Sequence, residues 1–561
     1  MQRICRNVWC LQPFDITTED LAFYEKVSPV FSGKKELIPP PKLCPECRDQ
    51  RRYTFRNERS LHHGTCTSCS KKIITMYAPE SPFNVYCTPC YFSDRWDAAS
   101  YGQALSFSEP LLTQFQRLRQ RIPVLSCDQY QCENSDYSNI SIGNKNCYLV
   151  FATREAEECY YARKLVKTLQ CVDCDYADES QYCYECTDCH RCYRVLFSEQ
   201  CYNCSSSAFL FDCIGAKNCF LCSNIRNRQY CFRNQQLTET DYRQQMSDLG
   251  SRLTIGRLQQ EFATVKTASI HRQSFNVCAE DCIGNHLTNC KRCLDCFDLY
   301  GCEECIYTVD TMSGVHHLMD CSSTTKDSEF SYDCVSCSTS IHSGFCVECR
   351  DGNVDCFYCD ATYSSQNLFG CAGLKHKQYC ILNKQYTEEE YERLVPKIIE
   401  KMRMDGEWGE FFPVELSPFA YNETVAQEYF PLTKEEVMER GWKWRDQTDE
   451  MPKVDRIIPA SQLPDSIDDI PDDILNWAIE CEATRRPFKI IKQELDFYRK
   501  MRLPVPHFHP DERHRRRMAL RNPRKLWNRE CAKCHKPIAT SYSPERPKIV
   551  YCEECYLKEV Y

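Results

Sequence analysis

The sequence predicts a mostly β protein with short helices, in which duplicated zinc-ribbon modules at both ends flank a duplicated, cysteine-rich, β-solenoid-like middle. Three observations predict this fold class. The chain of 561 residues contains 45 cysteines, a density that indicates either a disulfide framework or metal sites. The segment 56–91 repeats at 521–556 without a gap. Between these ends, cysteines recur at steps near twelve residues.

The repeated end segments each carry two Cys-x-x-Cys pairs, the spacing typical of structural zinc sites. Four thiolates close a tetrahedral site with no open position, so the metal would be structural and not catalytic. A module this small gains its folding energy from the metal. We therefore predict two Zn²⁺ sites, with ligands Cys66, Cys69, Cys87 and Cys90 at one end and Cys531, Cys534, Cys552 and Cys555 at the other.

A second motif precedes each ribbon. The segment 14–26 parallels 488–500, and both read as short amphipathic helices. In the N-terminal copy, cysteines on either side of the helix predict a third four-cysteine site: Cys5, Cys10, Cys44 and Cys47. In the C-terminal copy, His509 and Glu512 stand where Cys44 and Cys47 would be. We interpret this copy as metal-free, and a mixed site of Cys481, His507 and His509 remains an open alternative.

The middle of the chain reads as a ladder of short strands. Cys147-Tyr148 and Cys159-Tyr160 begin a series in which a cysteine precedes an aromatic residue. Adjacent residues on a strand face opposite sides, so the small thiol would line a narrow interior and the ring would point outward. Strands at a fixed step predict a parallel β-solenoid. The block 229–242 repeats at 378–391, and each copy ends in a helix capped by Thr238 or Thr387.

Three roles for the ladder cysteines remain open. They could be small buried hydrophobes filling a thin core, or disulfide links between coils in an oxidising compartment. They could also hold zinc or, less favoured, an iron–sulfur cluster, or act in redox chemistry. Side chains three apart fall on opposite faces of a regular strand, which argues against one shared metal. The candidates for this third role are two runs of Cys-x-x spacing: Cys183, Cys186, Cys189 and Cys192, and Cys290, Cys293 and Cys296.

Composition divides the chain into six parts. An N-terminal double zinc module (1–100) precedes two ladder repeats with closing helices (125–250 and 275–405). An aromatic segment (406–445) is predicted to cap the open end of the solenoid. An acidic linker with a helix from Pro471 (446–480) then leads to the C-terminal zinc module (481–561).

Arginine-rich segments run directly into both ribbons. The guanidinium fork bonds two phosphate oxygens at once, so these segments predict contact with nucleic acid or a ribonucleoprotein. A solvated helix face, or pairing with the acidic segment, is the alternative. Because the net charge is −9, any such contact must be local. The candidate residues are Arg51, Arg52, Arg56, Arg513, Arg515, Arg516, Arg517, Arg521, Arg524 and Lys525.

The ladder, the Gln-Tyr-Cys block at 229–231 and 378–380, and the segments 417–436 and 521–561 together resemble a cysteine-rich protein family of Candidate Phyla Radiation bacteria. The first fifty residues resemble the "probable zinc-ribbon domain" family, although Cys5 and Cys10 are separated by four residues where that family has two. These resemblances imply a bacterial source and zinc ribbons. They carry over no activity and no catalytic residues.

Nothing in the sequence indicates a reaction. We find no phosphate-binding glycine loop, HExxH or nucleophile elbow, so an enzyme is the less favoured interpretation. The first hypothesis is a non-enzymatic multi-zinc scaffold that binds nucleic acid through its ends. The others are a redox or metal-buffering protein and an exported, disulfide-linked solenoid with an adhesive role. The N-terminus has no apolar core typical of a signal peptide, and no apolar run reaches the ~20 residues of a membrane helix. We therefore expect a cytoplasmic protein without membrane contact, in an oligomeric state that the sequence leaves open.

Overall fold

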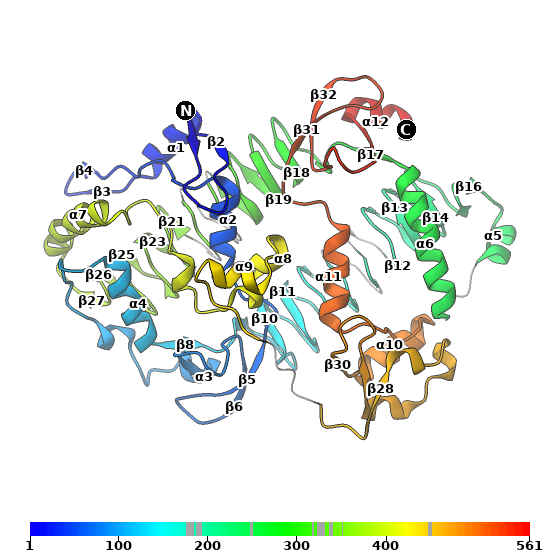
Figure 1. Ribbon diagram of the computed structural model, residues 1–561, viewed down its shortest axis with the longest axis horizontal. Helices are drawn as coiled ribbons and strands as arrows, with labels where there is room; N and C mark the ends of the chain where they lie inside the picture. Colours follow the sequence, from blue (N-terminus) through cyan, green and yellow to red (C-terminus); the bar gives the residue numbers. More distant parts are fainter. Residues whose placement is uncertain are drawn as a thin grey trace.

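The predicted fold class is confirmed by the computed structural model, which describes residues 1–175, 184–186, 193–246, 251–316, 319–321, 331–335, 340–350, 352–446 and 452–561. Two parallel β-solenoids form the middle of the chain, and their later strands reach opposite sides of the molecule (Figure 1). The four-cysteine groups lie in the modules at the two ends of the chain. Within these ranges no helix is both long and apolar enough to cross a lipid bilayer.

The coil of the first solenoid is built from four triplets of residues. Isolated parallel bridges join positions twelve apart, such as Lys145 with Glu157 and Tyr148 with Tyr160. The residue after each bridge position has left-handed φ, as at Asn146 (53°) and Leu149 (52°). The third residue of each triplet points inward, and the buried interior consists of these residues. A left-handed residue in every triplet turns the chain, so the coil has four sides of three residues each.

This geometry corrects one step of the sequence analysis. Side chains three apart do not alternate between faces, because a corner separates them. Cys201 and Cys204 are both buried in the same interior cluster, as are Cys219 and Cys222. The twelve-residue step was read correctly from the sequence, but its local conformation is not that of a regular extended strand.

The solenoid strands are short and parallel, with one antiparallel hairpin closing each stack. Several coils of the second solenoid contain one extra residue, since Met319 pairs with Tyr332 and Gly344 with Phe357. The strands of the first solenoid are β9 (Gln129–Tyr130), β10 (Ser138–Ile142), β11 (Val150–Arg154), β12 (Tyr193–Leu196), β13 (Ser205–Phe211), β14 (Phe220–Ser223), β15 (Cys231–Phe232) and β16 (Gln235–Gln236). Those of the second are β18 (Ile283–Thr288), β19 (Leu294–Glu303), β20 (Val309–His316), β21 (Ser340–Ile341), β22 (Cys349–Arg350), β23 (Asn353–Phe357), β24 (Thr362–Tyr363), β25 (Gln366–Phe369), β26 (Gln378–Ile381) and β27 (Lys384–Gln385).

Helices follow both stacks. The first stack leads to α5 (Glu239–Gln245) and α6 (Arg252–Ala268), and the second to α7 (Glu388–Asp405). The side chain of Thr238 accepts the N–H of Asp241 at the start of α5, and Thr387 with Glu390 forms a complete capping box on α7. Both helix starts were predicted from these residues.

The two terminal modules share one order of elements, except that the β3–β4 hairpin of the N-terminal module has no counterpart between α10 and α11. In the N-terminal module these are β1 (Gln2–Ile4), β2 (Pro13–Asp15), α1 (Thr18–Val27), β3 (Val30–Phe31), β4 (Lys34–Lys35), α2 (Pro45–Tyr53), β5 (His62–Thr65), β6 (Lys72–Thr75), β7 (Asn84–Tyr86) and α3 (Thr88–Tyr91). In the C-terminal module they are β30 (Pro487–Phe488), α10 (Lys492–Met501), α11 (Pro510–Leu520), β31 (Trp527–Glu530), β32 (Pro537–Thr540), β33 (Ile549–Tyr551) and α12 (Glu553–Val560).

The modules attach to the solenoids crosswise. Strand β7 of the N-terminal ribbon pairs with β8 (Pro123–Leu125), which follows α4 (Leu111–Arg121) and leads into the first solenoid. Strand β33 of the C-terminal ribbon pairs with β17 (Ile270–Arg272) before the second solenoid. Helix α11, however, lies beside the first solenoid (Figure 1), where Arg513 pairs with Asp173. Helix α2 lies against the second, where Arg48 pairs with Asp320.

The segments between α7 and the C-terminal module differ from the sequence predictions in two ways. Residues 406–445 pack along the side of the second solenoid and not over an open end, since the Trp408 ring is 6.5 Å from the rings of Phe345, Phe357 and Phe369 in three successive coils. The segment contains α8 (Val425–Tyr429) and α9 (Lys434–Glu439).

The predicted helix from Pro471 is only a 3₁₀ turn, Asp472–Asn476. It leads into strand β29 (Trp477–Glu480), which pairs with β28 (Arg456–Pro459) and β30. The acidic segment therefore contributes two strands to a small sheet, and Ile474 of the turn and Ala478 and Ile479 of β29 are fully buried. These long-range contacts outweigh the preference for a helix that starts at Pro471.

Candidate metal centres

Three groups of four cysteines could each hold one metal ion. In every group one Sγ atom from each residue lies within 4.8 Å of the others. They are the three sets predicted from spacing: Cys66, Cys69, Cys87 and Cys90; Cys531, Cys534, Cys552 and Cys555; and Cys5, Cys10, Cys44 and Cys47.

In each ribbon, one thiol pair lies on the turn of a hairpin and the other at the start of a helix. Cys66 and Cys69 lie between β5 and β6, whereas Cys87 is the N-cap of α3. The Sγ atoms of Cys69 and Cys87 are 3.8 Å apart. The equivalent Cys534 and Cys552 are 3.7 Å apart in the C-terminal ribbon. The longer Cys-x4-Cys loop at Cys5 also converges, since Cys10 and Cys44 are 3.8 Å apart.

Backbone N–H groups prepare one thiol of each ribbon for metal binding. Burial opposes ionisation of Cys66, but the N–H groups of Cys87, Cys69 and Ser68 outweigh it and lower its pKa to about 6. The pKa of Cys531 is also lowered to about 6 in the same way. Thiolates are the form that binds Zn²⁺, so the donor set fits a tetrahedral, closed metal site.

The C-terminal copy of the third site retains its fold without its ligands. The turn at Cys481 has the same two backbone hydrogen bonds as the turns at Cys66 and Cys531. The cysteine N–H donates to the carbonyl five residues later, and the cysteine carbonyl accepts the N–H four residues later. Thr484 occupies the place of the second cysteine. Among the described residues, Cys481, His507 and His509 form no group close enough for one ion.

The ladder thiols line the solenoid interiors. Cys201 Sγ lies 3.4 Å from the carbonyl oxygen of Glu199 and 3.6 Å from that of Leu210. The Ser198 hydroxyl makes the equivalent contact with Leu196 O at 2.8 Å, so the thiols behave as small residues that bond the coil backbone. No disulfide bond joins the cysteines whose side chains the structure describes.

The proposed metal or redox runs lie partly outside the described residues. Cys183, Cys189 and Cys192 are not described, and Cys186 is buried. Cys290, Cys293 and Cys296 occupy successive inward positions of the second solenoid. In the part of the chain that the structure describes, they belong to none of the three metal-competent groups.

Most of the candidate nucleic-acid residues are engaged inside the molecule. Arg52 and Arg517 are 0 and 3% exposed. Arg52 bonds Asp333 at 2.5 Å, and Arg517 bonds Asp173 and Asp175, each at 2.8 Å. The other inward-facing members are Arg51 with Asp333, Arg56 with Glu58, Arg513 with Asp173, and Arg521 and Arg524 with Asp298.

The remaining three candidates face solvent. Arg515 and Arg516 both bond Glu512, and Lys525 bonds Glu46. Their side chains are 69, 49 and 49% exposed. The sequence does not separate these residues from their buried neighbours, since both kinds occur within a single run.

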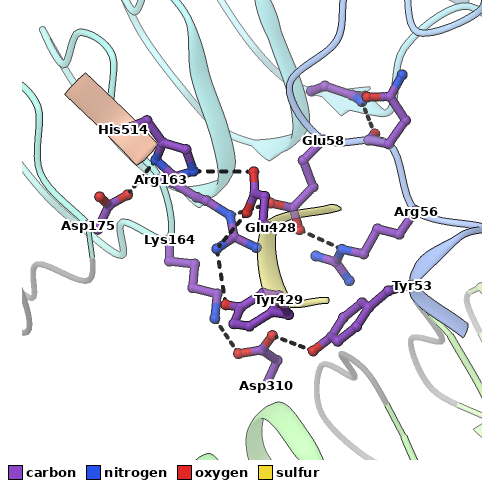
Figure 2. Close-up of polar contacts among 12 residues, drawn as sticks. Tyr53, Arg56, Glu58, Arg163, Lys164, Asp175, Asp310, Glu428, Tyr429 and His514 are labelled. Atoms are coloured by element: carbon purple, nitrogen blue, oxygen red, sulfur yellow. Dashed lines mark hydrogen bonds and ion pairs between the residues drawn. The ribbon is translucent and has the colours of Figure 1, made fainter. Parts of the chain in front are cut away.

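A buried network joins the modules at the centre of the molecule (Figure 2). Glu58 binds Arg56 at 2.6 Å and also Arg163 of the first solenoid. Burial alone would raise the pKa of Glu58, but the two guanidinium groups hold it well below its usual range. Nearby, Asp310 of the second solenoid accepts bonds from Tyr53 at 3.1 Å and from Lys164. One network thus contacts both solenoids.

His514 of α11 extends this network, with its ring nitrogens 3.4 Å from Asp175 and 3.2 Å from Glu428 (Figure 2). The solenoid carboxylates that pair with these arginines were not predicted from the sequence. Asp173 and Asp320 occupy left-handed corner positions (φ 54° and 64°) in the two repeats. Aspartate tolerates the left-handed conformation. The recurrence of aspartate at corner positions of both repeats is the sequence signal that could have identified these residues.

No protein-family model and no curated protein matches this chain. One solved structure shows a weak likeness, a putative acetyltransferase from Desulfovibrio desulfuricans G20. It is 8% identical, the match covers 51% of this chain and 82% of that chain, and the TM-score is 0.10. At that score the likeness carries no argument, so the function must be argued from the residues themselves.

Proposed function

We propose that this protein is a non-enzymatic scaffold in which three structural Zn²⁺ ions hold the terminal modules onto two β-solenoids. The observation that carries the proposal is the convergence of three separate four-cysteine groups. Four thiolate donors and a closed geometry suit Zn²⁺ in a structural role. The solenoid interiors are thin and filled with small residues, so metal bound at the ends would add folding energy that these cores supply only in part.

Elemental analysis of natively purified protein tests this proposal. We expect three zinc ions per chain and no iron. Cys90→Ser should lose one zinc, whereas the matched ladder variant Cys201→Ser should keep all three. Iron, or a zinc count that falls in the ladder variant, would assign the metal chemistry to the solenoids and overturn the proposal.

We also propose that the protein works in a reducing compartment such as the cytoplasm. No disulfide bond joins the described cysteines, and thiols persist where disulfides are kept reduced. A free-thiol count on protein denatured without reductant, after the metal is removed, should approach the full set of 45 cysteines. A count near zero would instead support the exported, disulfide-linked alternative.

Binding of nucleic acid or a ribonucleoprotein remains a proposal with a reduced set of residues. Arginines buried in ion pairs reach a phosphate only after losing their carboxylate partners, which leaves Arg515, Arg516 and Lys525 as the accessible charges among the candidates. Replacing these three by Glu should abolish RNA binding at moderate salt if the proposal is right. RNA affinity that is absent in the wild type, or unchanged in the variant, would exclude it.

A further inference from the structure

The two terminal modules hold the solenoids through matching contacts. Arg48 of α2 bonds Asp320 at 2.7 Å, and Arg513, which occupies the same place in α11, bonds Asp173 at 2.5 Å. The aromatic contacts match as well. The Tyr24 ring lies 5.3 Å from that of Tyr332, and the Tyr498 ring lies 5.7 Å from that of Tyr184. We call these contacts, together with the ion pairs of Arg52 with Asp333 and of Arg517 with Asp173 one helical turn further on, the N-terminal clasp, on the second solenoid, and the C-terminal clasp, on the first.

The clasps differ in what fixes the start of the arginine helix. The N-cap of helix α2 is Cys44, whose side chain makes no capping hydrogen bond and belongs to the N-terminal four-cysteine group. Cys47, another member of that group, directly precedes Arg48. The position of the arginine side chains therefore depends on the geometry of the four sulfur atoms.

Helix α11 begins with protein contacts alone. The ring of His509, at the position of Cys44, accepts the N–H of Asp511 and caps the helix. Asp511 also forms an ion pair with Arg486 at 2.9 Å. The backbone carbonyl of Arg486 accepts the N–H of Cys481 and so closes the turn at Cys481. The edge of His509 packs against Phe488, with the ring centroids 6.1 Å apart. The same architecture is thus held without a metal.

We infer that the N-terminal four-cysteine site is a metal-responsive latch on the second solenoid, whereas the C-terminal clasp is a metal-independent latch on the first. The inference rests on the proposed zinc occupancy of Cys5, Cys10, Cys44 and Cys47. Loss of that ion frees the first turn of α2, and the arginines lose their alignment with the solenoid. Asp320, Asp333 and the adjacent Tyr332, all 1% exposed or less, then become accessible as an acidic and aromatic surface.

Amide hydrogen exchange on the full chain, with the metal content measured in parallel, tests the latch. In Cys44→Ser/Cys47→Ser, which should lose one zinc, we expect exchange in α2 and at 306–310 and 331–335 to rise at least about tenfold, which is the opening expected when local stability falls by about 1.4 kcal/mol. Exchange at 159–175, under the C-terminal clasp, should stay unchanged. Cys481→Ser, which removes the remaining cysteine of the metal-free copy, should keep three zinc ions and the exchange pattern of the wild type.

Two further variants separate metal loss from clasp loss. Cys90→Ser should also lose one zinc, but its increased exchange should be confined to the ribbon and β8. Arg52→Met should keep three zinc ions and still raise exchange at 331–335. If a cysteine variant does not fold, stepwise removal of zinc from the wild type by a chelator gives the same comparison. Three zinc ions in the wild type, with exchange at 306–310 and 331–335 unaffected by loss of the N-terminal ion, would overturn the latch but leave the scaffold proposal standing. Fewer than three zinc ions in the wild type would instead contradict the scaffold proposal, on which the latch depends.

Discussion

Replacing Arg517 by Ala should destabilise the first solenoid strongly. Its side chain is 4% exposed and bonds Asp173 and Asp175 at 2.8 Å each, with a third contact to the carbonyl oxygen of Tyr161 at 3.3 Å. Removing one partner of a buried ion pair leaves an uncompensated charge and costs about 3–5 kcal/mol. Arg517→Lys keeps the charge but cannot bond both carboxylates, so we expect an intermediate loss.

The matched control is Arg515→Ala, two residues away on the same helix. Arg515 is 69% exposed and bonds the neighbouring Glu512, so its loss should cost less than about 1 kcal/mol. A chain of several modules need not unfold in one step. The free energy should therefore be read from amide exchange at 159–175 across a urea series. Equal effects of the two alanine variants, within about 1 kcal/mol, would refute the assignment of Arg517 to the clasp.

Three further predictions concern other parts of the structure. Lys375→Met should loosen the attachment of the N-terminal ribbon by about 1–2 kcal/mol, measured by exchange in α3, because its ammonium lies 4.5 to 5.2 Å from the ring centroids of Tyr91, Phe92 and Trp96. Inside the first solenoid, Cys201→Ser should leave the thermal melting transition nearly unchanged, since Ser198 already bonds the backbone in the same way. Cys201→Leu should lower the free energy of unfolding by about 1–3 kcal/mol, because the larger side chain overpacks the interior. Burial raises the pKa of Glu348 to about 7, so the folded protein binds its proton more tightly than the unfolded chain, and stability should fall as the pH rises from about 4.3 to about 7. Glu348→Gln should flatten that part of a stability–pH profile, and an unchanged slope would contradict the assignment.

The metal groups could be predicted from sequence because their ligands are local. A Cys-x-x-Cys pair places two thiols on one turn, and the repeat of 56–91 at 521–556 shows which pairs belong together. The Cys5–Cys10 pair departs from that spacing, yet its longer loop reaches the same site. The twelve-residue coil was predicted for a similar reason, since equivalent residues of successive solenoid coils recur at a fixed interval in the sequence.

The contacts between modules could not be predicted in this way. Arg513 and Arg515 look alike in the sequence, but helix periodicity turns one toward Asp173 and the other toward solvent. The partner of Arg513 is 340 residues away along the chain, whereas that of Arg515 is three residues away. The local corner geometry also escaped prediction, because left-handed φ at residues such as Leu149 and Tyr161 contradicts their ordinary preference. In the solenoid, hydrogen bonds between successive coils outweigh that preference.

The crosswise attachment explains why a chain with such thin cores would carry metal modules at both ends. A solenoid coil contacts only its neighbours, so its first coil needs a cover and its sides need support from elsewhere. Here β7 and β33 pair with the strands leading into the two stacks, and the arginine helix of each module lies against the other stack. Each solenoid is therefore held by both ends of the chain. Loss of either module would expose one solenoid at its start and the other at its side, which makes the stability of the two solenoids interdependent although each has its own core.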